Sequence, residues 1–300
     1  MNSNNNQISR KNAAIWAIIA CVLWSTAFVT LKLGLVYIKP FSFAGIRFMI
    51  AGVMLFPFWL GKVHRNDITP HSLWILFKVA LLQTFLLYGL FYYAITIVSG
   101  AVASIIIGAS PIVSAVVAHF ICHDDKLNNA KIICMLTAAS GVILVVLGIK
   151  PWAAGGIKES AGIGVLILGS VVSSLANIIV SNDKKNMNPV FINSVQIFTG
   201  GLMLFLLSVP LEGLPDFTGL PVGFYFVLGW LAFISAAAFS IWFFLLQYDN
   251  IKVSELNFWK FLIPVFGATL SWIVLAGESP NVLTLSGMVL VAFAVWRYSR

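Results

Sequence analysis

The sequence contains, at residues 100–126, the stretch GAVASIIIGASPIVSAVVAHFICHDDK, an apolar segment with a proline at its middle and carboxylates at its end. A similar stretch occurs in the second half of the chain: Asp125 lies 14 residues after Pro111, and Glu278 lies 14 residues after Pro264. A proline in a membrane helix frees a backbone carbonyl, which must be received by protein or by a water-filled cavity. Paired interruptions in corresponding halves therefore indicate a binding site at the interface between two repeats.

The composition places the chain in a membrane. Apolar residues make up 60% and charged residues 9% of the 300 positions, and the mean hydropathy is +0.97. A water-facing domain carries roughly 25% charged residues. The net charge of +8 comes from basic residues scattered singly between apolar runs, which favours membrane topology over a nucleic-acid partner. Three cysteines without CxxC spacing indicate neither a disulfide framework nor a structural zinc site.

Ten apolar runs are long enough to cross ~30 Å of hydrocarbon, which takes about 20 helical residues. They fall at approximately 13–33, 42–61, 72–97, 101–121, 129–149, 161–181, 190–209, 222–247, 253–275 and 281–297. A β-barrel would show short alternating segments instead. The sequence therefore predicts an all-α integral membrane protein with ten transmembrane helices.

Lysines and arginines predict the orientation of these helices. The N-terminus and the alternate connections on its side hold eleven of them: Arg10, Lys11, Lys62, Arg65, Lys126, Lys131, Lys184, Lys185, Lys252, Arg297 and Arg300. The opposite connections hold three: Lys39, Lys150 and Lys158. The positive-inside rule places both termini in the cytoplasm. Because five is odd, two five-helix halves enter the membrane from opposite faces. We expect a cytoplasmic tail at 1–12, a first repeat at 13–149, an external linker at 150–160 and a second, inverted repeat at 161–300.

A second pair of matching positions supports the duplication. Pro40 precedes Arg47 by seven residues, and Pro189 precedes Gln196 by seven. The two prolines are 149 residues apart, close to the 153 residues that separate Pro111 from Pro264.

These features resemble the EamA-type, ten-helix branch of the drug/metabolite transporter superfamily. The resemblance rests on the two five-helix halves, on Trp24, Ser25 and Thr26 in the first span, on Pro40 with Arg47, and on the repeated proline-to-acid segments. It implies a monomeric or weakly dimeric carrier in the cytoplasmic (inner) membrane that exports small metabolites, often amino acids, by alternating access. One departure is Asp125 where glutamate is expected, and the neighbouring Asp124 leaves open which carboxylate caps that helix end.

The basic residues inside the spans differ in depth. Arg47 and Lys78 lie about six residues inside their spans, roughly 9 Å at 1.5 Å per residue, so we interpret both as snorkelling to the headgroups. Lys260 lies four residues before Pro264, about one turn from the expected kink. A position facing the cavity, where it meets an anionic group or a carbonyl dipole, is one of two equally supported interpretations. Acidic residues near the middle of a span are absent from the sequence, so facilitated diffusion or exchange is as well supported as proton antiport.

Aromatic, small and amide residues are the candidate lining of a substrate cavity. The predicted substrate-binding residues are Trp24, Tyr88, Tyr92, Ser104, Gly108, Pro111, Asn177, Phe239, Trp242, Asn257, Lys260 and Pro264. Lipid contact is the alternative for each aromatic side chain, close helix packing is the alternative for Ser104 and Gly108, and hydrogen bonding between helices is the alternative for amides such as Gln83, Asn193 and Gln196. We expect a small zwitterionic or weakly anionic substrate with an apolar part, such as an amino acid.

Other function classes are less well supported. His119, Cys122, His123, Asp124 and Asp125 are of metal-ligand types, but polar residues belong where a helix leaves the membrane, and no second cluster completes a tetrahedral site. Neither a Walker A loop nor a GxSxG elbow occurs in the sequence, so we expect no cofactor and no enzymatic activity. The competing hypothesis to a carrier is a non-transporting membrane subunit that anchors a partner protein.

Overall fold

The computed structural model describes residues 7–63, 68–98, 100–149, 157–183, 187–274 and 280–299, and these residues form helices and connections without a strand. The first half contains α1 (Arg10–Gly34), α2 (Pro40–Trp59), α3 (Pro70–Val79), the π-helical segment η2 (Ala80–Leu86), α4 (Leu87–Ala94), α5 (Gly100–Gly108), α6 (Ser110–Ile121) and α7 (Asn129–Ile149). The second half contains α8 (Ile157–Asn182), α9 (Pro189–Glu212), α10 (Val222–Leu246), α11 (Val253–Phe258), the 3₁₀ turn η3 (Trp259–Phe261), α12 (Leu262–Val274) and α13 (Val282–Ser299).

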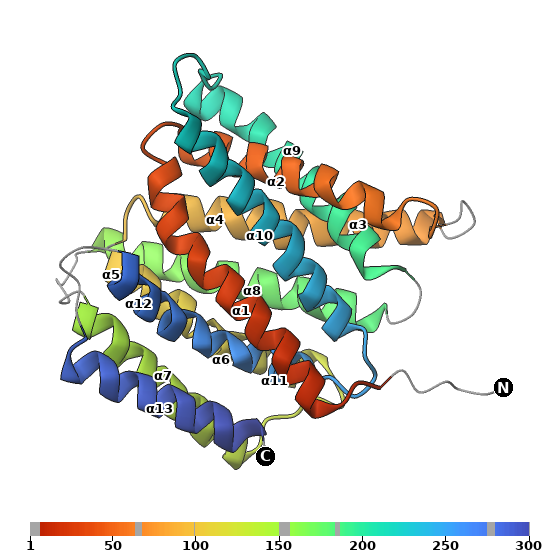
Figure 1. Ribbon diagram of the computed structural model, residues 1–300. Coiled ribbons are helices and arrows are strands. Elements are labelled where there is room, and N and C mark those ends of the chain that lie inside the picture. Colours follow the sequence, from red (N-terminus) through yellow and green to blue (C-terminus); the bar gives the residue numbers. More distant parts are fainter. Residues whose placement is uncertain are drawn as a thin grey trace.

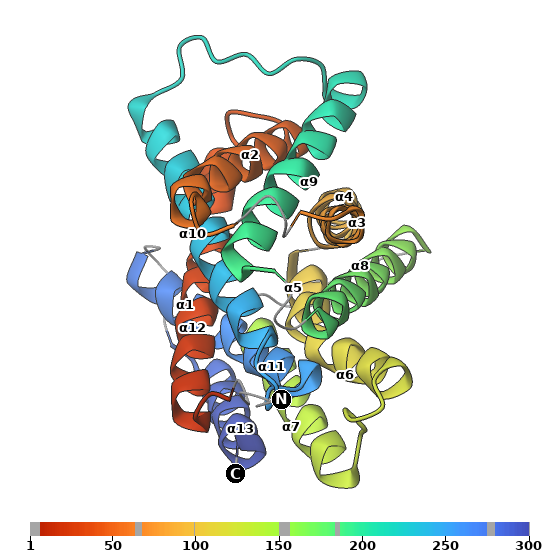
Figure 2. The same ribbon diagram turned by 90° about the vertical axis from the view of Figure 1, so that its right-hand side faces the viewer.

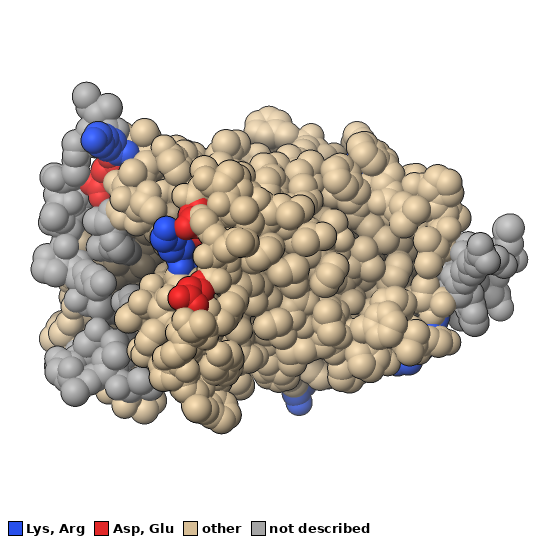
Figure 3. All heavy atoms as spheres, turned by 90° about the horizontal axis from the view of Figure 1, so that it is seen from above, with Lys and Arg blue, Asp and Glu red and all other residues tan. Residues whose placement is uncertain are grey.

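Much of the helical surface is suited to lipid. Within the described residues, seven helices are long and apolar enough to cross a membrane, and further apolar helices, among them the one at Val282–Tyr298, accompany them. Figure 3, seen from the end where α2 and α9 cross, shows a face that is uncharged over most of its area. The chain is therefore a multi-pass membrane protein, whereas the number of ten spans stays a prediction.

Capping residues set where the helices begin. Ser9 caps α1 by accepting a hydrogen bond from the backbone N–H of Asn12, and Asn188 caps α9 in the same manner. α1 therefore starts at Arg10, within the stretch expected to be a tail, and α8 starts at Ile157, within the expected linker. Hydropathy marks the apolar run and not the polar first turn, so a helix can begin a few residues before the span that the sequence predicts.

The packing of the helices repeats between the halves. The second helix of the first half, α2, packs on its counterpart α9, and the fifth, α7, packs on its counterpart α13. Figures 1 and 2 both show the α2–α9 pair at one end of the molecule and the α7–α13 pair at the other. The contact of α1 with α10 is matched by that of α8 with α4, and the contact of α1 with α12 by that of α8 with α6. A two-repeat layout accounts for each of these pairs.

Glycines allow the two pairs to approach closely. A Cβ atom on Gly141 of α7 would lie 2.7 Å from the carbonyl oxygen of Gly287 of α13, and one on Gly287 would lie 2.5 Å from the carbonyl oxygen of Gly141. At the other crossing, a Cβ on Gly201 of α9 would lie 3.0 Å from the carbonyl oxygen of Gly45 of α2. Small residues at these positions let the backbones touch, as in other membrane helix pairs.

Candidate functional site

The two helical segments that carry Pro111 and Pro264 are each interrupted near the middle. In the second half, the 3₁₀ turn η3 separates α11 from α12, and Pro264 lies in the first turn of α12. In the first half, Ala109 separates α5 from α6, and Pro111 lies in the first turn of α6. The interruptions occur where the sequence predicts them. Glu278, the acid expected to follow Pro264, lies outside the described residues.

Lys260 lies within this interruption and projects onto two tryptophans. Its Nζ atom is 4.8 Å from the ring centroid of Trp242 in α10 and 5.7 Å from that of Trp24 in α1. The two indole rings are 5.0 Å apart, and the ring of Phe239 is 5.3 Å from Trp24. Four of the predicted site residues therefore form one group, which we call the Lys260 cluster: Trp24, Phe239, Trp242 and Lys260.

The Lys260 cluster carries hydrogen-bond donors without protein acceptors. Among the described residues, no carboxylate lies within 4.0 Å of the Lys260 ammonium, and no acceptor forms a hydrogen bond with it. The Nε1 atoms of Trp24 and Trp242 are buried and also lack a partner in the described part of the chain. A buried donor without an acceptor costs about 1–3 kcal/mol. The cluster thus presents one cation and two N–H groups that an anionic ligand can satisfy.

Arg47 is a second buried cation, and its interpretation as a snorkelling residue is wrong. Its side chain is only 5% exposed, and its guanidinium carbon lies 4.3 Å from the ring centroid of Phe48 and 5.4 Å from that of Tyr88. Its position follows from helical periodicity, because Ala44, Phe48 and Ala51 lie on the same buried face of α2. The spacing of these apolar residues indicates the buried face of α2 already in the sequence. The distance of Arg47 from the helix end, on which the interpretation was based, does not.

Lys78 differs from Arg47 although both lie at a similar depth. Its Nζ atom lies 5.8 Å from the ring of Trp74, and Trp74 is 57% exposed on the outer surface. This arrangement agrees with the expectation of a residue that reaches outward.

Tyr88 and Tyr92 lie beside Arg47 and not in the Lys260 cluster. The ring of Tyr88 is 4.5 Å from Phe48, and Tyr92 packs at 5.2 Å on Phe91. The hydroxyl of Tyr92 is buried without a hydrogen-bond partner among the described residues. The predicted aromatic lining is therefore divided into two groups, each with one cation.

Asp125 ties the connection between α6 and α7 to the start of α11. Its carboxylate accepts hydrogen bonds from the backbone N–H of Ser254, at 2.7 Å, and from the Ser254 hydroxyl, and it pairs with Lys131 at 3.1 Å. Asp125 is 2% exposed, whereas the side chain of Asp124 is exposed. Lys252 donates to the backbone carbonyl of Asp124 at 2.6 Å. Of the two adjacent acids, Asp125 is therefore the one whose carboxylate caps a helix.

With this geometry in place, the chain can be compared with known proteins. The model of the EamA-like transporter family matches residues 11–147 and again residues 160–299. The chain belongs to the EamA-like transporter family. Each match covers one of the two halves, so the family assignment and the repeated helix packing agree.

Several transporters resemble this EamA-like chain along its whole length. The uncharacterized transporters YoaV and YvbV of Bacillus subtilis (strain 168) are 23% and 24% identical to it and align with 92% and 96% of the chain and 92% of their own lengths. An uncharacterized transporter of Archaeoglobus fulgidus is 22% identical over 94% of the chain and 97% of its own length. A solved crystal structure superposes with a TM-score of 0.80 at 16% identity, covering 96% of each chain, which shows a shared fold. EamA-like transporters are in general not enzymes.

The predicted amides Asn177 and Asn257 pair with one another between α8 and α11. Asn177 Nδ2 donates to Asn257 Oδ1 at 3.3 Å, and Asn257 Nδ2 donates to the carbonyl of Val253 at 2.9 Å. The Oδ1 atom of Asn177 is buried without a partner in the described part of the chain. Asn257 lies on α11, which leads into Lys260 one turn later, and Asn177 reaches it from α8.

A buried polar network around η2 of this EamA-like chain was only partly anticipated. Thr84 Oγ1 donates to Gln196 Oε1 at 2.6 Å, Gln196 Nε2 donates to Asn193 Oδ1 at 3.0 Å, and Asn193 Nδ2 donates to the carbonyl of Ala236 at 3.0 Å. The contacts of Thr84 with Gln196 and of Asn193 with Ala236 are hydrogen bonds between helices, as considered for the amides, whereas the contact of Gln196 with Asn193 lies within α9. The π-helical segment that carries Gln83 and Thr84 was not predicted, although such segments often occur at functional sites.

The remaining predicted residues lie on the interrupted helices, and the structure gives Gly108 and Pro264 a packing contact. A Cβ on Gly108 would lie 2.9 Å from Pro264 Cγ and 2.7 Å from Val142 Cγ1. Pro111 is buried in α6, and Ser104 is half-buried in α5, one turn before Gly108. Substrate contact at these four residues stays a prediction.

Proposed function

We propose that this EamA-like transporter exports small organic metabolites by alternating access, and that its substrates are amino acids or related zwitterionic or weakly anionic compounds with an apolar part. The observation that carries the proposal is the Lys260 cluster. It combines a cation without a carboxylate partner, two free indole N–H groups and an aromatic surface at the interruption of a membrane helix.

The chemistry of the cluster suits a substrate with two different ends. A substrate carboxylate pairs with the Lys260 ammonium, and Trp24 and Trp242 add N–H donors. The substrate's apolar part packs on the rings of Trp24, Phe239 and Trp242. Without substrate, the two indole faces stabilise the ammonium through cation–π contacts. A substrate that brings a carboxylate therefore replaces a weak interaction with a stronger, charge-assisted one.

The second cation supports the same class of substrate. Arg47 has no carboxylate within 4.0 Å among the described residues, and its Nε atom is buried without a partner. Its guanidinium lies against Phe48 and Tyr88 in the same arrangement of cation and aromatic ring as at Lys260. A carrier that moved cationic compounds would place carboxylates at these positions.

Topology completes the proposal. Ten spans in two inverted repeats, with both termini cytoplasmic, agree with the excess of lysine and arginine on one side. Cysteines introduced at Lys62 and Asp216, in a variant without Cys122, test it with an impermeant reagent added to intact cells. We expect labelling of position 216 only. Labelling of position 62 and not 216 from outside would reverse the orientation.

Reconstituted transport tests the substrate class. Proteoliposomes loaded with unlabelled amino acids are supplied with radiolabelled neutral, acidic and basic amino acids, and with amines that have the same side chains but no carboxylate. For an amino acid that the unmodified protein transports, Lys260→Met should raise the concentration that gives half-maximal transport roughly tenfold to a hundredfold, as expected from losing a charged hydrogen bond. The amines should not be exchanged by either protein.

Lys78→Met is the matched control, because it removes a lysine that also lies over a tryptophan but on the outer surface. It should transport as the unmodified protein does. If the unmodified protein exchanges the amines as readily as the amino acids, or if Lys260→Met inserts normally and transports with unchanged half-saturation, the proposed recognition of a carboxylate is wrong.

A further inference from the structure

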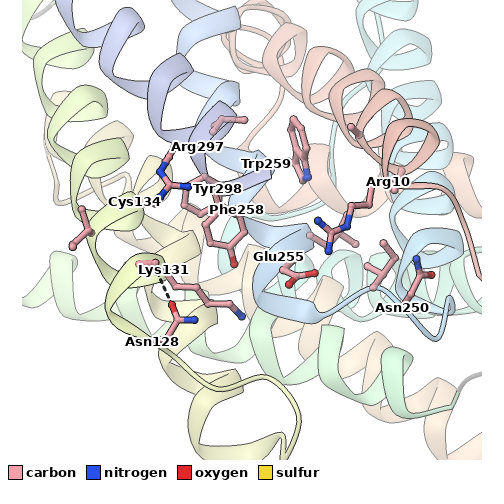
Figure 4. A pocket seen from close by; sticks show the side chains of 17 residues that line it. Arg10, Asn128, Lys131, Cys134, Asn250, Glu255, Phe258, Trp259, Arg297 and Tyr298 are labelled. Carbon is pink, nitrogen blue, oxygen red and sulfur yellow. Dashed lines mark hydrogen bonds between the residues drawn. The ribbon is translucent and has the colours of Figure 1, made fainter. Parts of the chain in front are cut away.

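A pocket lies apart from the Lys260 cluster, where α1 begins and α13 ends. It has a volume of about 510 Å³ and is formed by residues of α1, α7, α11, η3 and α13, so both halves contribute to it. Figure 4 shows Arg10 and Arg297 at opposite sides of the pocket, with Phe258, Trp259 and Tyr298 between them. The rings of Phe258 and Tyr298 stack with centroids 3.9 Å apart, which gives the pocket a rigid inner wall.

The charge of the pocket is positive. Arg10, Lys131 and Arg297 come from three different helices, and Glu255 is the acid among the described lining residues. Lys131 is already paired with Asp125 at 3.1 Å. Within the described residues, neither arginine has a carboxylate within 4.0 Å, Glu255 included. Both guanidinium groups are therefore available to a ligand, and a negatively charged one is favoured.

Exposed aromatic and apolar side chains occur in and near the pocket. Trp16 of α1 and Trp296 of α13, which are close in sequence to lining residues of the pocket, are 43% and 48% exposed, as expected for an interfacial aromatic belt. Ile133, which lines the pocket, is 63% exposed, and Val295 forms another apolar part of the wall. The pocket thus continues from a basic rim onto an apolar surface.

We propose that this pocket binds an anionic phospholipid, with its phosphate between Arg10 and Arg297 and an acyl chain over Ile133 and Val295. A basic pocket between membrane helices on the cytoplasmic side is suited to an acidic headgroup, and the proposed topology places this pocket on that side. An inorganic anion would use the arginines and leave the apolar wall without a function. Because the pocket joins α1, α7, α11 and α13, the bound lipid connects the two repeats at this end of the molecule.

Native mass spectrometry of the full chain in detergent tests the proposal. The protein is titrated with phosphatidylglycerol and phosphatidylcholine that have identical acyl chains, and with inorganic phosphate. We expect preferential binding of phosphatidylglycerol. Arg10→Gln and Arg297→Gln should each weaken it about fivefold, and the double variant about thirtyfold, given the usual contribution of a basic residue beside an anionic lipid. Both side chains are exposed, so these variants should fold.

Lys11→Gln is the control, because it removes an exposed cation next to Arg10 that does not line the pocket. It should bind phosphatidylglycerol as the unmodified protein does. The proposal is overturned if the double variant keeps the lipid preference, if Lys11→Gln loses it to the same extent, or if inorganic phosphate displaces the lipid at equal concentration. The last outcome would identify a site for a soluble anion.

Discussion

Replacing Asp125 with alanine should destabilise the protein by about 3 kcal/mol. The substitution removes the acceptor of two hydrogen bonds from Ser254 and the partner of Lys131. Breaking a buried ion pair by removing one partner costs about 3–5 kcal/mol. The lower end applies because the Lys131 side chain is 15% exposed, so water can partly solvate its ammonium once the carboxylate is gone.

Asp124 supplies the matched control for this substitution. It is the neighbouring acid, its side chain is exposed, and Lys252 contacts its backbone carbonyl, which alanine retains. Asp124→Ala should therefore change the free energy of unfolding by less than about 0.5 kcal/mol. The loss of unfolding free energy in Asp125→Asn should lie between those of Asp125→Ala and Asp124→Ala, because the amide oxygen still accepts from Ser254 but carries no charge to pair with Lys131.

Equilibrium unfolding in mixed micelles, followed by tryptophan fluorescence, measures these differences. A double-mutant cycle with Lys131→Met isolates the ion pair, and transport by Asp125→Ala should also fall because α11 leads into Lys260. Equal losses of stability for the Asp124 and Asp125 variants would refute the reasoning, since they would mean that the capping contact with Ser254 contributes nothing specific.

Two further substitutions test the packing and the buried network. Gly141→Ala should lower the free energy of unfolding by about 1–3 kcal/mol, because the added Cβ would press on the carbonyl of the facing helix. Gly164→Ala has open space at its Cβ and should stabilise α8 by about 0.5–1 kcal/mol. If both glycines respond alike, close approach of α7 and α13 is not the reason for Gly141. Thr84→Val should cost about 1–3 kcal/mol by leaving Gln196 Oε1 without its donor, as measured by the same unfolding assay. An unchanged stability would show that water replaces the threonine hydroxyl.

The helical architecture was predictable because it follows from local chemistry. Long continuous apolar runs form helices in lipid, because a helix satisfies its backbone polar groups within one segment and a β-barrel would need short alternating segments. The interruptions near Pro111 and Pro264 were predictable because proline lacks the backbone N–H that donates the next helical hydrogen bond. The family assignment followed from combining these signals with the spacing of the repeats.

The contacts of the site were less predictable because they depend on partners distant in the sequence. Asp125 and Asp124 are adjacent, and what distinguishes them is Ser254, 129 residues away from Asp125. The segment Ala80–Leu86 contains neither glycine nor proline, so its π-helical conformation has no local signal. Arg47 was misinterpreted because depth in a span does not reveal which face of the helix is buried.

The two cations show how a symmetric frame can hold an asymmetric site. Arg47 and Gln196 occupy matching positions seven residues after a proline, yet Gln196 belongs to a neutral network with Thr84 while Arg47 lies against aromatic rings. Lys260 corresponds, at the 153-residue offset, to the apolar Ile107. Each pair of equivalent positions thus carries one cation and one neutral residue. Glycines at the helix crossings and prolines at the interruptions occur in both halves, so the repeated residues build the frame. In the proposed function, the unmatched residues would distinguish the two ends of a substrate. A ligand with one anionic end and one apolar end would consequently bind in a single orientation, even between two halves that pack alike.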